Sequence, residues 1–300
     1  MRTLQDVSIS DRQVALTNLD KILWPAPVIT KADLIKYYLA VAPTALKHWS
    51  GRPLTITRYP NGIEGDGFYQ KNCPDYAPEW ITRVPLVTDN KTTEYIICND
   101  LATLVWLGNQ GMLEIHPALY HLDFYPAPSF AVIDLDPTAP AGFTEARDTA
   151  KKVKLVLDEL GLRGYPKTSG ATGIHIYIPL KPRYTFKQTS RLVEFIGKIL
   201  VQFYPETVTN ERLIKNRHGV YIDHLQNLAG KTIVGVYSPR PLPQAPVSTP
   251  VRWEELDEIK PENFTVETVP LRIEQQGDLF EPVLSDLQSI DHLLKFFSDK

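Results

Sequence analysis

Cysteine is scarce in this chain, which contains two among its 300 residues, Cys73 and Cys98. Two cysteines exclude a disulfide-rich scaffold and suit a reducing compartment, and their separation in the sequence excludes a zinc site built on a cysteine pair. No stretch approaches about 18 consecutive apolar residues, so we expect no membrane-spanning helix. The first residues contain no apolar segment typical of a signal peptide. We therefore expect a cytoplasmic protein, associated with the nucleoid if it binds DNA.

Neither sign of charge dominates, but the charges are unevenly distributed. The net charge is 0 over residues 1–100, -5 over 101–146, +9 over 147–240 and -7 over 241–300. An acidic patch beside a basic block is typical of a metal-dependent enzyme that acts on polyphosphates, because carboxylates hold cations while lysine and arginine bind phosphate. For the lysines at 151–154 alone, we favour the alternative of a solvated helix surface.

Strand and helix patterns alternate along the chain. We expect a helix over 31–49, in which Pro43 predicts a kink or a break. Strands are expected over 53–59, 94–98, 129–135, 174–180, 219–223 and 231–237, and helices over 100–107 (N-cap Asp100), 144–160 (N-cap Thr144) and 186–203. Residues 238–250 are rich in proline and predict an extended connector, followed by an acidic, helical C-terminal appendage. This alternation predicts a mixed α/β or α+β fold.

Two aspartates close an apolar strand pattern at Asp134-Leu135-Asp136. Because strand side chains alternate, both carboxylates point to one face, where they repel each other unless a cation lies between them. Asp223 closes another apolar strand pattern, and three such carboxylates could hold two Mg²⁺ or Mn²⁺ ions for a phosphoryl displacement. The alternative is a set of ordinary solvent-exposed turn residues.

A glycine turn, Ser169-Gly170-Ala171-Thr172-Gly173, precedes a strand with isoleucines at alternate positions. Such a turn can present backbone N–H groups to phosphate. The isoleucines predict a core face, so His175 and Tyr177 share the opposite face. A histidine there could contact a phosphate or protonate a leaving group, or it could be an ordinary residue on a half-exposed sheet face. The sequence is not a P-loop, since its lysine signature is absent.

The order of these motifs, D-x-D, then S-G-x-x-G-x-H, then a strand-end aspartate, resembles the archaeo-eukaryotic primase superfamily. Further segments are similar to the polymerase domain of bacterial DNA ligase D. These are residues 14–25 (VALTNLDKILWP), 51–53 (GRP), 58–62 (RYPNG), 68–71 (FYQK), 226–227 (QN), 237–240 (YSPR) and 253–256 (WEEL). The resemblance runs from about residue 12 to 260. It implies an α+β fold with a primase-like core of mixed sheets flanked by helices.

The resemblance also implies roles for individual residues. The carboxylates Asp134, Asp136 and Asp223 match catalytic metal ligands. Expected nucleotide contacts are His116, Ser169, Gly170, His175, Gln226 and Arg240; expected ligands of a DNA 5′-phosphate are Asn18, Lys21 and Lys31. Phe68 and Tyr69 match a pair that stacks on template bases, and Arg58 and Lys71 are expected to contact DNA. The sequence departs from the pattern of that family at two positions. Tyr69 stands where a second phenylalanine is frequent, and His224 stands where an aromatic residue is usual.

The resemblance implies a polymerase that adds nucleotides, preferentially ribonucleotides, to DNA 3′ ends at gaps and double-strand breaks in non-homologous end joining. Expected cofactors are two divalent cations, Mn²⁺ or Mg²⁺; expected partners are gapped or 3′-overhanging DNA with a 5′-phosphate, NTP or dNTP, Ku and an ATP-dependent ligase. The alternatives are a primase that starts strands de novo and an inactive module that binds DNA ends.

We expect one polymerase domain over 1–300. Its expected parts are a DNA-end-binding part (1–120), a catalytic core (121–240), and the connector with the C-terminal appendage (241–300). No ligase or nuclease domain and no KxDG nucleophile motif is found in the sequence, so it represents either a stand-alone polymerase or one part of a larger protein.

Overall fold

The computed structural model describes residues 4–88 and 91–297 and divides the chain into two compact units. Unit 1 consists of residues 1–118, 234–248 and 262–278, and unit 2 of residues 119–233, 249–261 and 279–300. Each unit is therefore assembled from segments that are far apart in the sequence. Whether the two units act as one polymerase domain with the expected parts stays a prediction.

Unit 2 is built on a five-stranded sheet in the order β11-β12-β10-β14-β13. Its strands are β10 (Phe130–Pro137), β11 (Tyr165–Thr168), β12 (Ile174–Pro179), β13 (Val208–Thr209) and β14 (Val220–Ile222). All neighbouring pairs are antiparallel except β13 and β14, which are parallel. The sheet is thus mixed, as expected for an α+β fold, and β10 is its central strand.

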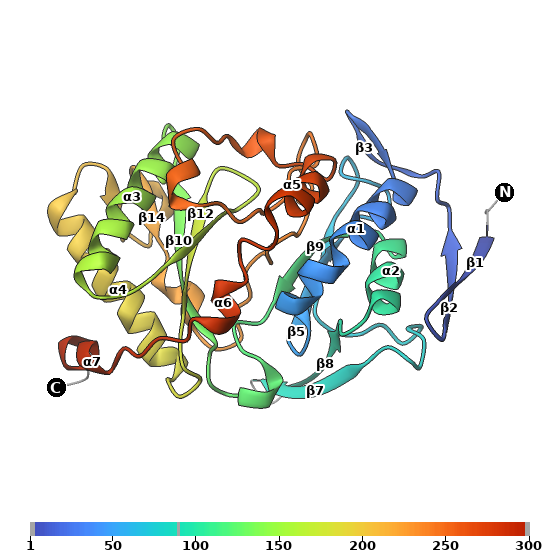
Figure 1. The fold of residues 1–300 in the computed structure, drawn as a ribbon, viewed down its shortest axis with the longest axis horizontal. Helices are drawn as coiled ribbons and strands as arrows, with labels where there is room; N and C mark the ends of the chain where they lie inside the picture. The colour runs from blue at the N-terminus through green and yellow to red at the C-terminus, as the bar shows by residue number, and fades with distance from the viewer. Residues whose placement is uncertain (1–3, 89–90, 298–300) are drawn as a thin grey trace. The chain divides into compact units, whose positions relative to one another are not determined.

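Two long helices cover one face of this sheet, α3 (Phe143–Glu159) and α4 (Phe186–Phe203) (Figure 1). Two glycines lie at contacts between the helices and the sheet. A Cβ atom on Gly164 would lie 2.6 Å from Leu157 of α3 and 2.7 Å from Ile176 of β12, so only glycine fits there. A Cβ atom on Gly197 of α4 would lie 3.6 Å from Ile222 of β14, in ordinary contact. The isoleucine face of the sheet is therefore the helix-covered face, and polar residues at the alternate positions lie on the other face.

Unit 1 contains a second five-stranded sheet, with the order β6-β5-β8-β7 and with β9 also paired to β5. Its strands are β5 (Pro53–Arg58), β6 (Phe68–Gln70), β7 (Arg83–Thr88), β8 (Lys91–Ile97) and β9 (Met112–Pro117). The helices α1 (Lys31–Trp49) and α2 (Leu101–Asn109) pack together, and α2 also contacts β9. Two hairpins complete the N-terminal part: β1 (Leu4–Ile9) with β2 (Arg12–Thr17), and β3 (Ile22–Pro25) with β4 (Val28–Thr30).

The remaining elements are short. They are the 3₁₀ helices η1 (Leu122–Phe124), η2 (Ile214–Asn216), η3 (His224–Asn227), η4 (Trp253–Glu255) and η5 (Pro261–Asn263), and the helices α5 (Thr268–Gln276), α6 (Pro282–Ser285) and α7 (Asp291–Phe297). The C-terminal segment is helical, as expected. No helix within residues 4–88 and 91–297 is long and apolar enough to cross a membrane.

Most predicted elements are confirmed, and the Asp100 side chain caps α2 by accepting a hydrogen bond from the backbone N–H of Thr103. Pro43, however, lies inside an uninterrupted α1. The N-cap of α3 is Gly142 and not Thr144, because Glu145 accepts a hydrogen bond from the Gly142 N–H and the helix begins one residue earlier.

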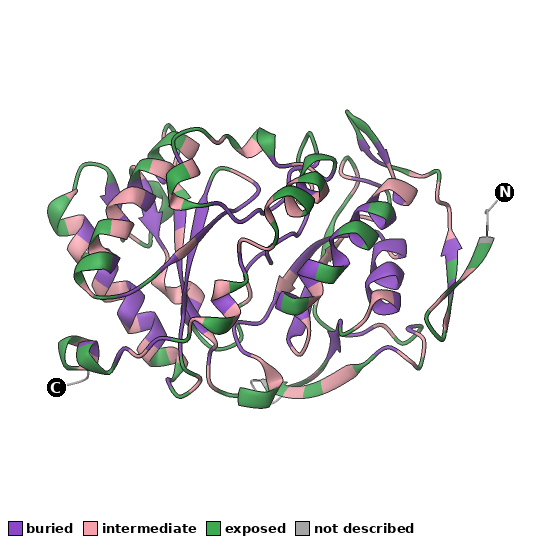
Figure 2. Ribbon diagram, in the orientation of Figure 1, coloured by how far each residue is buried: buried purple, intermediate pink, exposed green. Residues whose placement is uncertain are grey.

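The prediction of a strand over residues 231–237 is wrong. Residues 231–237 form no strand, although Ile233, Val234 and Val236 are buried. In the proline-rich segment predicted as an extended connector, residues 245–250 are all buried (Figure 2). The apolar pattern over 231–237 identifies a buried segment, but only pairing with a neighbouring backbone decides whether such a segment becomes a strand.

Candidate active site

A row of polar side chains crosses the sheet of unit 2. Lys167 of β11 is paired with His175 of β12, which is paired with Asp134 of β10. Asp223 directly follows β14, and its backbone N–H donates to the Asp134 carbonyl at 3.3 Å. Because directly paired residues point to the same face of a sheet, the four side chains share the face opposite the helices.

Asp136 lies two residues beyond Asp134 on the same strand and therefore on the same face. Burial raises the pKa of Asp136; the Arg217 guanidinium opposes this shift, and the carboxylate of Asp223 reinforces it. The Arg217 Nη1 atom is 3.8 Å from Asp136 Oδ2, and its guanidinium stacks 3.5 Å from the Tyr221 ring centroid. Two carboxylates close enough to repel each other form an arrangement that a cation stabilises.

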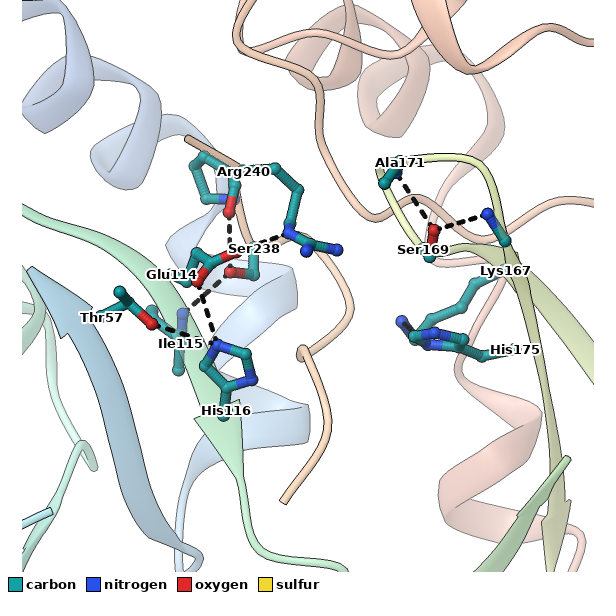
Figure 3. A network of polar contacts seen from close by, with 12 residues as sticks. Thr57, Glu114, Ile115, His116, Lys167, Ser169, Ala171, His175, Ser238 and Arg240 are labelled. Atoms are coloured by element: carbon teal, nitrogen blue, oxygen red, sulfur yellow. Dashed lines mark hydrogen bonds and ion pairs between the residues drawn. The ribbon is translucent and has the colours of Figure 1, made fainter. Parts of the chain in front are cut away.

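The glycine turn is organised by the Ser169 hydroxyl. Its Oγ atom accepts hydrogen bonds from the backbone N–H groups of Ala171 (3.1 Å) and Gly173 (3.0 Å) (Figure 3). A Cβ atom on Gly173 would lie 2.7 Å from the carbonyl oxygen of Leu135, so β10 and the turn approach each other only because this residue is glycine. The Ser169 hydroxyl is thus the acceptor for two N–H groups of the turn, and binding of phosphate by the turn stays a prediction.

The strand after the turn is buried on both faces. The exposed fraction is 5% for His175 and 4% for Tyr177, compared with 0% for the isoleucines between them. The alternative of a half-exposed sheet face is therefore wrong. Lys167 Nζ lies 2.9 Å from His175 Nδ1, and His175 Nε2 lies 3.4 Å from Asp134 Oδ1. His175 is thus held between a cation and a carboxylate.

The helical turn η3, which follows Asp223, is tied to the central strand. Asn227 is completely buried and pairs with both backbone groups of Val132 on β10, at 2.7 and 2.8 Å. Its neighbour Gln226, an expected nucleotide contact, donates from Nε2 to the carbonyl of Thr232 at 2.6 Å. The Gln226 amide is therefore directed at the backbone in this structure.

In unit 1, two expected nucleotide contacts share one carboxylate that the sequence analysis missed. Glu114 Oε1 accepts from Arg240 Nε at 2.6 Å, and Oε2 lies 3.3 Å from His116 Nε2 (Figure 3). Burial alone would raise the pKa of Glu114, but the hydrogen bond from His116 and the charge of Arg240 outweigh burial and lower the pKa to about 2. Thr57 Oγ1 lies 3.5 Å from the same His116 nitrogen.

Three cations lie near the start of α1. Lys31 is 6% exposed and donates to the Thr17 carbonyl at 2.7 Å, while Lys21 donates to the Pro60 carbonyl at 2.8 Å. Burial, followed by the charges of Lys21 and Arg58, lowers the pKa of Lys31 to about 8. Mutual repulsion of this kind is what a bound anion relieves.

Asn18, the third residue predicted for this pocket, has a left-handed backbone with φ of 51°. Its carbonyl accepts from the backbone N–H of Lys21 at 3.1 Å. The turn from residue 18 to 21 therefore closes through the backbone and fixes where Lys21 leaves the chain.

The two aromatic residues of β6 lie on opposite faces of this edge strand. Phe68 is paired with Arg58, whose guanidinium lies 5.2 Å from the Phe68 ring centroid. Tyr69 makes an edge contact with His116 at 5.7 Å between ring centroids. The rings are 45% and 54% exposed, so each is available to stack, but they do not form one continuous platform. Lys71, just beyond the strand, is exposed.

Comparison with known proteins now places the chain in a family. A family model described as LigD, primase-polymerase domain, matches residues 30–280. The chain belongs to the LigD primase-polymerase family. It is 38% identical over 291 residues to the bifunctional non-homologous end joining protein LigD of Bacillus subtilis, and 33% identical over 298 residues to the multifunctional LigD of Mycobacterium tuberculosis H37Rv. These alignments cover 94% and 96% of this chain but 47% and 39% of the relatives, so the chain spans less than half of their length.

The fold comparison agrees with the LigD primase-polymerase assignment. The polymerase domain of Mycobacterium tuberculosis ligase D, solved in complex with DNA, superimposes with a TM-score of 0.85 at 33% identity. The match covers 92% of this chain and 99% of that one. The family and the primase-like α+β fold expected from the sequence are confirmed, and family membership identifies the chemistry as nucleotidyl transfer by a primase-polymerase.

The LigD primase-polymerase family implies the use of divalent metal ions. Within residues 4–88 and 91–297, no group of three or more histidine, cysteine, aspartate or glutamate side chains is gathered closely enough to hold a metal. The donor chemistry nevertheless fits a hard cation, since Asp134, Asp136 and Asp223 share one sheet face and the last two repel each other. For all three carboxylates to coordinate one metal ion, their side chains would have to change conformation, while the strands could stay in place.

Sequence reasoning missed three residues that contact predicted site residues, and two of the three left a signal in the sequence. Glu114 lies two positions before His116 in a strand pattern and so shares its face. Lys167 is a charged residue in a short, otherwise uncharged strand segment directly before the glycine turn. Arg217 lies in the charged loop before β14 and has no local pattern that marks it, because its contact with Asp136 is tertiary.

Proposed function

We propose that this chain is a DNA repair polymerase that extends DNA 3′ ends at gaps and double-strand breaks, with a preference for ribonucleotides. The observation that supports this most directly is the placement of Asp134, Asp136 and Asp223 on one face of adjacent strands, beside His175. Burial, reinforced by the nearby carboxylate of Asp223, raises the pKa of Asp136, and a binding module without activity would have no need to hold a carboxylate in such a place.

In the proposed reaction, the 3′-hydroxyl oxygen of the primer attacks the α-phosphorus of the nucleotide. A new P–O bond forms, the bond to the β-phosphate bridging oxygen breaks, and pyrophosphate leaves with that electron pair. Divalent cations, Mn²⁺ or Mg²⁺, would supply Lewis acidity that eases loss of the hydroxyl proton to water and neutralises charge. Asp134, Asp136 and Asp223 would hold those cations, and the Ser169-Gly170 turn with His175 forms the proposed nucleotide side of the site.

The residues of unit 1 supply further proposed contacts to the nucleotide and DNA. Arg240 and His116, both oriented by Glu114, suit a nucleotide's anionic oxygens, with Gln226 of unit 2 as a further expected contact. Lys21 and Lys31, together with Asn18, suit a terminal 5′-phosphate, which carries more negative charge than an internal one. Their charges already repel one another in the absence of an anion.

Single-stranded template is the proposed ligand of the exposed β6 edge. Phe68 and Tyr69 are each about half exposed, and aromatic rings stack on unpaired bases of any sequence. The Arg58 guanidinium, which contacts Phe68 and donates to Tyr76 Oη at 2.6 Å, adds a cation beside that surface. Lys71 follows on the exposed continuation of the strand.

The relatives are named as non-homologous end joining proteins. These names support action of the present chain in the same process. We propose Ku and an ATP-dependent ligase as its partners and the bacterial cytoplasm, at the nucleoid, as its location. Since the chain spans less than half of those relatives, the ligase is either another part of the same protein or a separate partner.

The deciding experiment is incorporation of labelled ATP or dATP on a gapped duplex with a 5′-phosphate, in Mn²⁺ and in Mg²⁺. We expect incorporation by the wild type, with ATP preferred. Asp134→Asn and Asp136→Asn should abolish it while DNA binding persists, and Asp158→Asn on the outer surface of α3 is the matched control. Synthesis on an unprimed template would favour the primase alternative, and binding without incorporation would favour the inactive module.

A further inference from the structure

Lys167 is an unusual residue in unit 2, because its side chain is completely buried. Burying a lysine ammonium is costly unless polar partners replace its water. Two neighbours on β12 provide compensation. Its Nζ atom lies 2.9 Å from His175 Nδ1 and 5.7 Å from the centroid of the Tyr177 ring. A lysine at so costly a position points to a role for its contact with His175.

The geometry of this contact fixes where the histidine carries its proton. An ammonium group has three donors and no acceptor, so Lys167 can only donate to His175. The receiving atom Nδ1 must then present a lone pair, and a neutral imidazole with a bare Nδ1 carries its proton on Nε2. The Nε2 atom is the one that lies 3.4 Å from Asp134 Oδ1.

We propose that Lys167 is a positioning residue that locks His175 in the Nε2–H tautomer, so that the edge facing Asp134 donates a hydrogen bond to an anionic oxygen. Pairing of Lys167, His175 and Asp134 across three neighbouring strands holds the arrangement in register. The acceptors are the Asp134 carboxylate and, resting on the proposed function, a phosphate oxygen of the incoming nucleotide. A donor at this atom cannot act as the base that removes the 3′-hydroxyl proton.

The direct test is ¹⁵N NMR of the histidine rings in the metal-free wild-type protein at neutral pH. His175→Gln identifies its signals among those of the seven histidines. In the wild type we expect His175 to carry its proton on Nε2 and none on Nδ1. In Lys167→Met we expect a larger fraction of the Nδ1–H tautomer than in the wild type. A wild-type spectrum with the proton on Nδ1 overturns the proposal, and this result does not depend on whether the variant folds.

Kinetics on the gapped substrate at saturating metal provides the second test. Lys167→Met should raise the KM for ATP about tenfold, the loss expected for one hydrogen bond to a charged group, while kcat changes far less. Lys154→Met, which removes a positive charge from the surface of the same unit, should leave KM unchanged. An unchanged KM in Lys167→Met overturns the proposal.

A double-mutant cycle separates tautomer control from general damage. A glutamine at position 175 places an amide N–H near the Nε2 position and has no ring tautomer to select. Lys167→Met should therefore add little to the KM of His175→Gln, and an equal tenfold increase in both backgrounds overturns the proposal. If the chain shows no polymerase activity but wild-type His175 is protonated on Nε2, the proposed function fails and the tautomer assignment stands.

Discussion

Glu114 should stabilise unit 1 through its contacts with Arg240 and His116, and Glu114→Gln tests this with a nearly isosteric change. The carboxylate is buried, and its pKa is lowered from 4.5 to about 2. At about 1.4 kcal/mol per pH unit, this corresponds to about 3 kcal/mol that favours the charged form in the folded protein. Removing one partner of a buried ion pair costs about 3–5 kcal/mol, so the two estimates agree.

The pH dependence of this effect has a defined sign. Because the pKa of Glu114 is lower in the folded than in the unfolded chain, its contribution is complete above about pH 4.5 and is lost as the pH falls towards about 2. Glu114→Gln resembles the protonated state at every pH. The difference in unfolding free energy between wild type and variant should therefore be about 3 kcal/mol at pH 7 and should shrink below pH 4.5.

Urea unfolding, followed at several pH values between 3 and 7, measures this difference. The matched control is Glu94→Gln, because Glu94 forms a 3.8 Å ion pair with Arg83 in the same unit but is 48% exposed. Such a surface pair should contribute less than about 1 kcal/mol. Equal losses for the two variants at pH 7, or a loss for Glu114→Gln that stays constant down to pH 3, would refute the reasoning.

Three further changes test other parts of the site. Binding of a gap with a 5′-phosphate, relative to the same gap without it, should weaken as the pH rises above about 8, since free Lys31 loses its proton there. The variant Lys31→Arg should keep the preference for the 5′-phosphate in the same titration, and a wild-type preference that stays constant to pH 9.5 would contradict this. Ser169→Ala should lower ATP and dATP incorporation together, because it removes the acceptor for two N–H groups of the turn, and a loss confined to ATP would instead indicate a ribose contact. Gly173→Ala should destabilise the protein by about 1–3 kcal/mol in thermal unfolding, because the added Cβ would meet the Leu135 carbonyl oxygen. Gly142→Ala is the control and should cost less, since its Cβ would have no contact closer than 3.9 Å; equal losses of stability would show that the turn can move.

Helices were the most predictable part of this fold. The pattern over 186–203 became α4 with the same bounds, since its apolar face and its cap are both local signals. The predicted strand over 231–237 did not form, because a strand requires a partner backbone that local sequence does not specify. Pro43 did not break α1, although proline lacks the N–H that an interior helix residue donates.

The sequence by itself determined which motifs face the same way. Alternation along one strand places Asp134 and Asp136 on one face, and the spacing of the glycine turn places His175 directly after it, because side-chain direction in a strand has a period of two. Only the tertiary structure decided which residues lie opposite them. Strand order and register brought Lys167 beside His175, and a distant segment brought Arg240 to Glu114. These pairings depend on backbone hydrogen bonds and packing between segments far apart in the chain, which leave no periodic signal in the sequence.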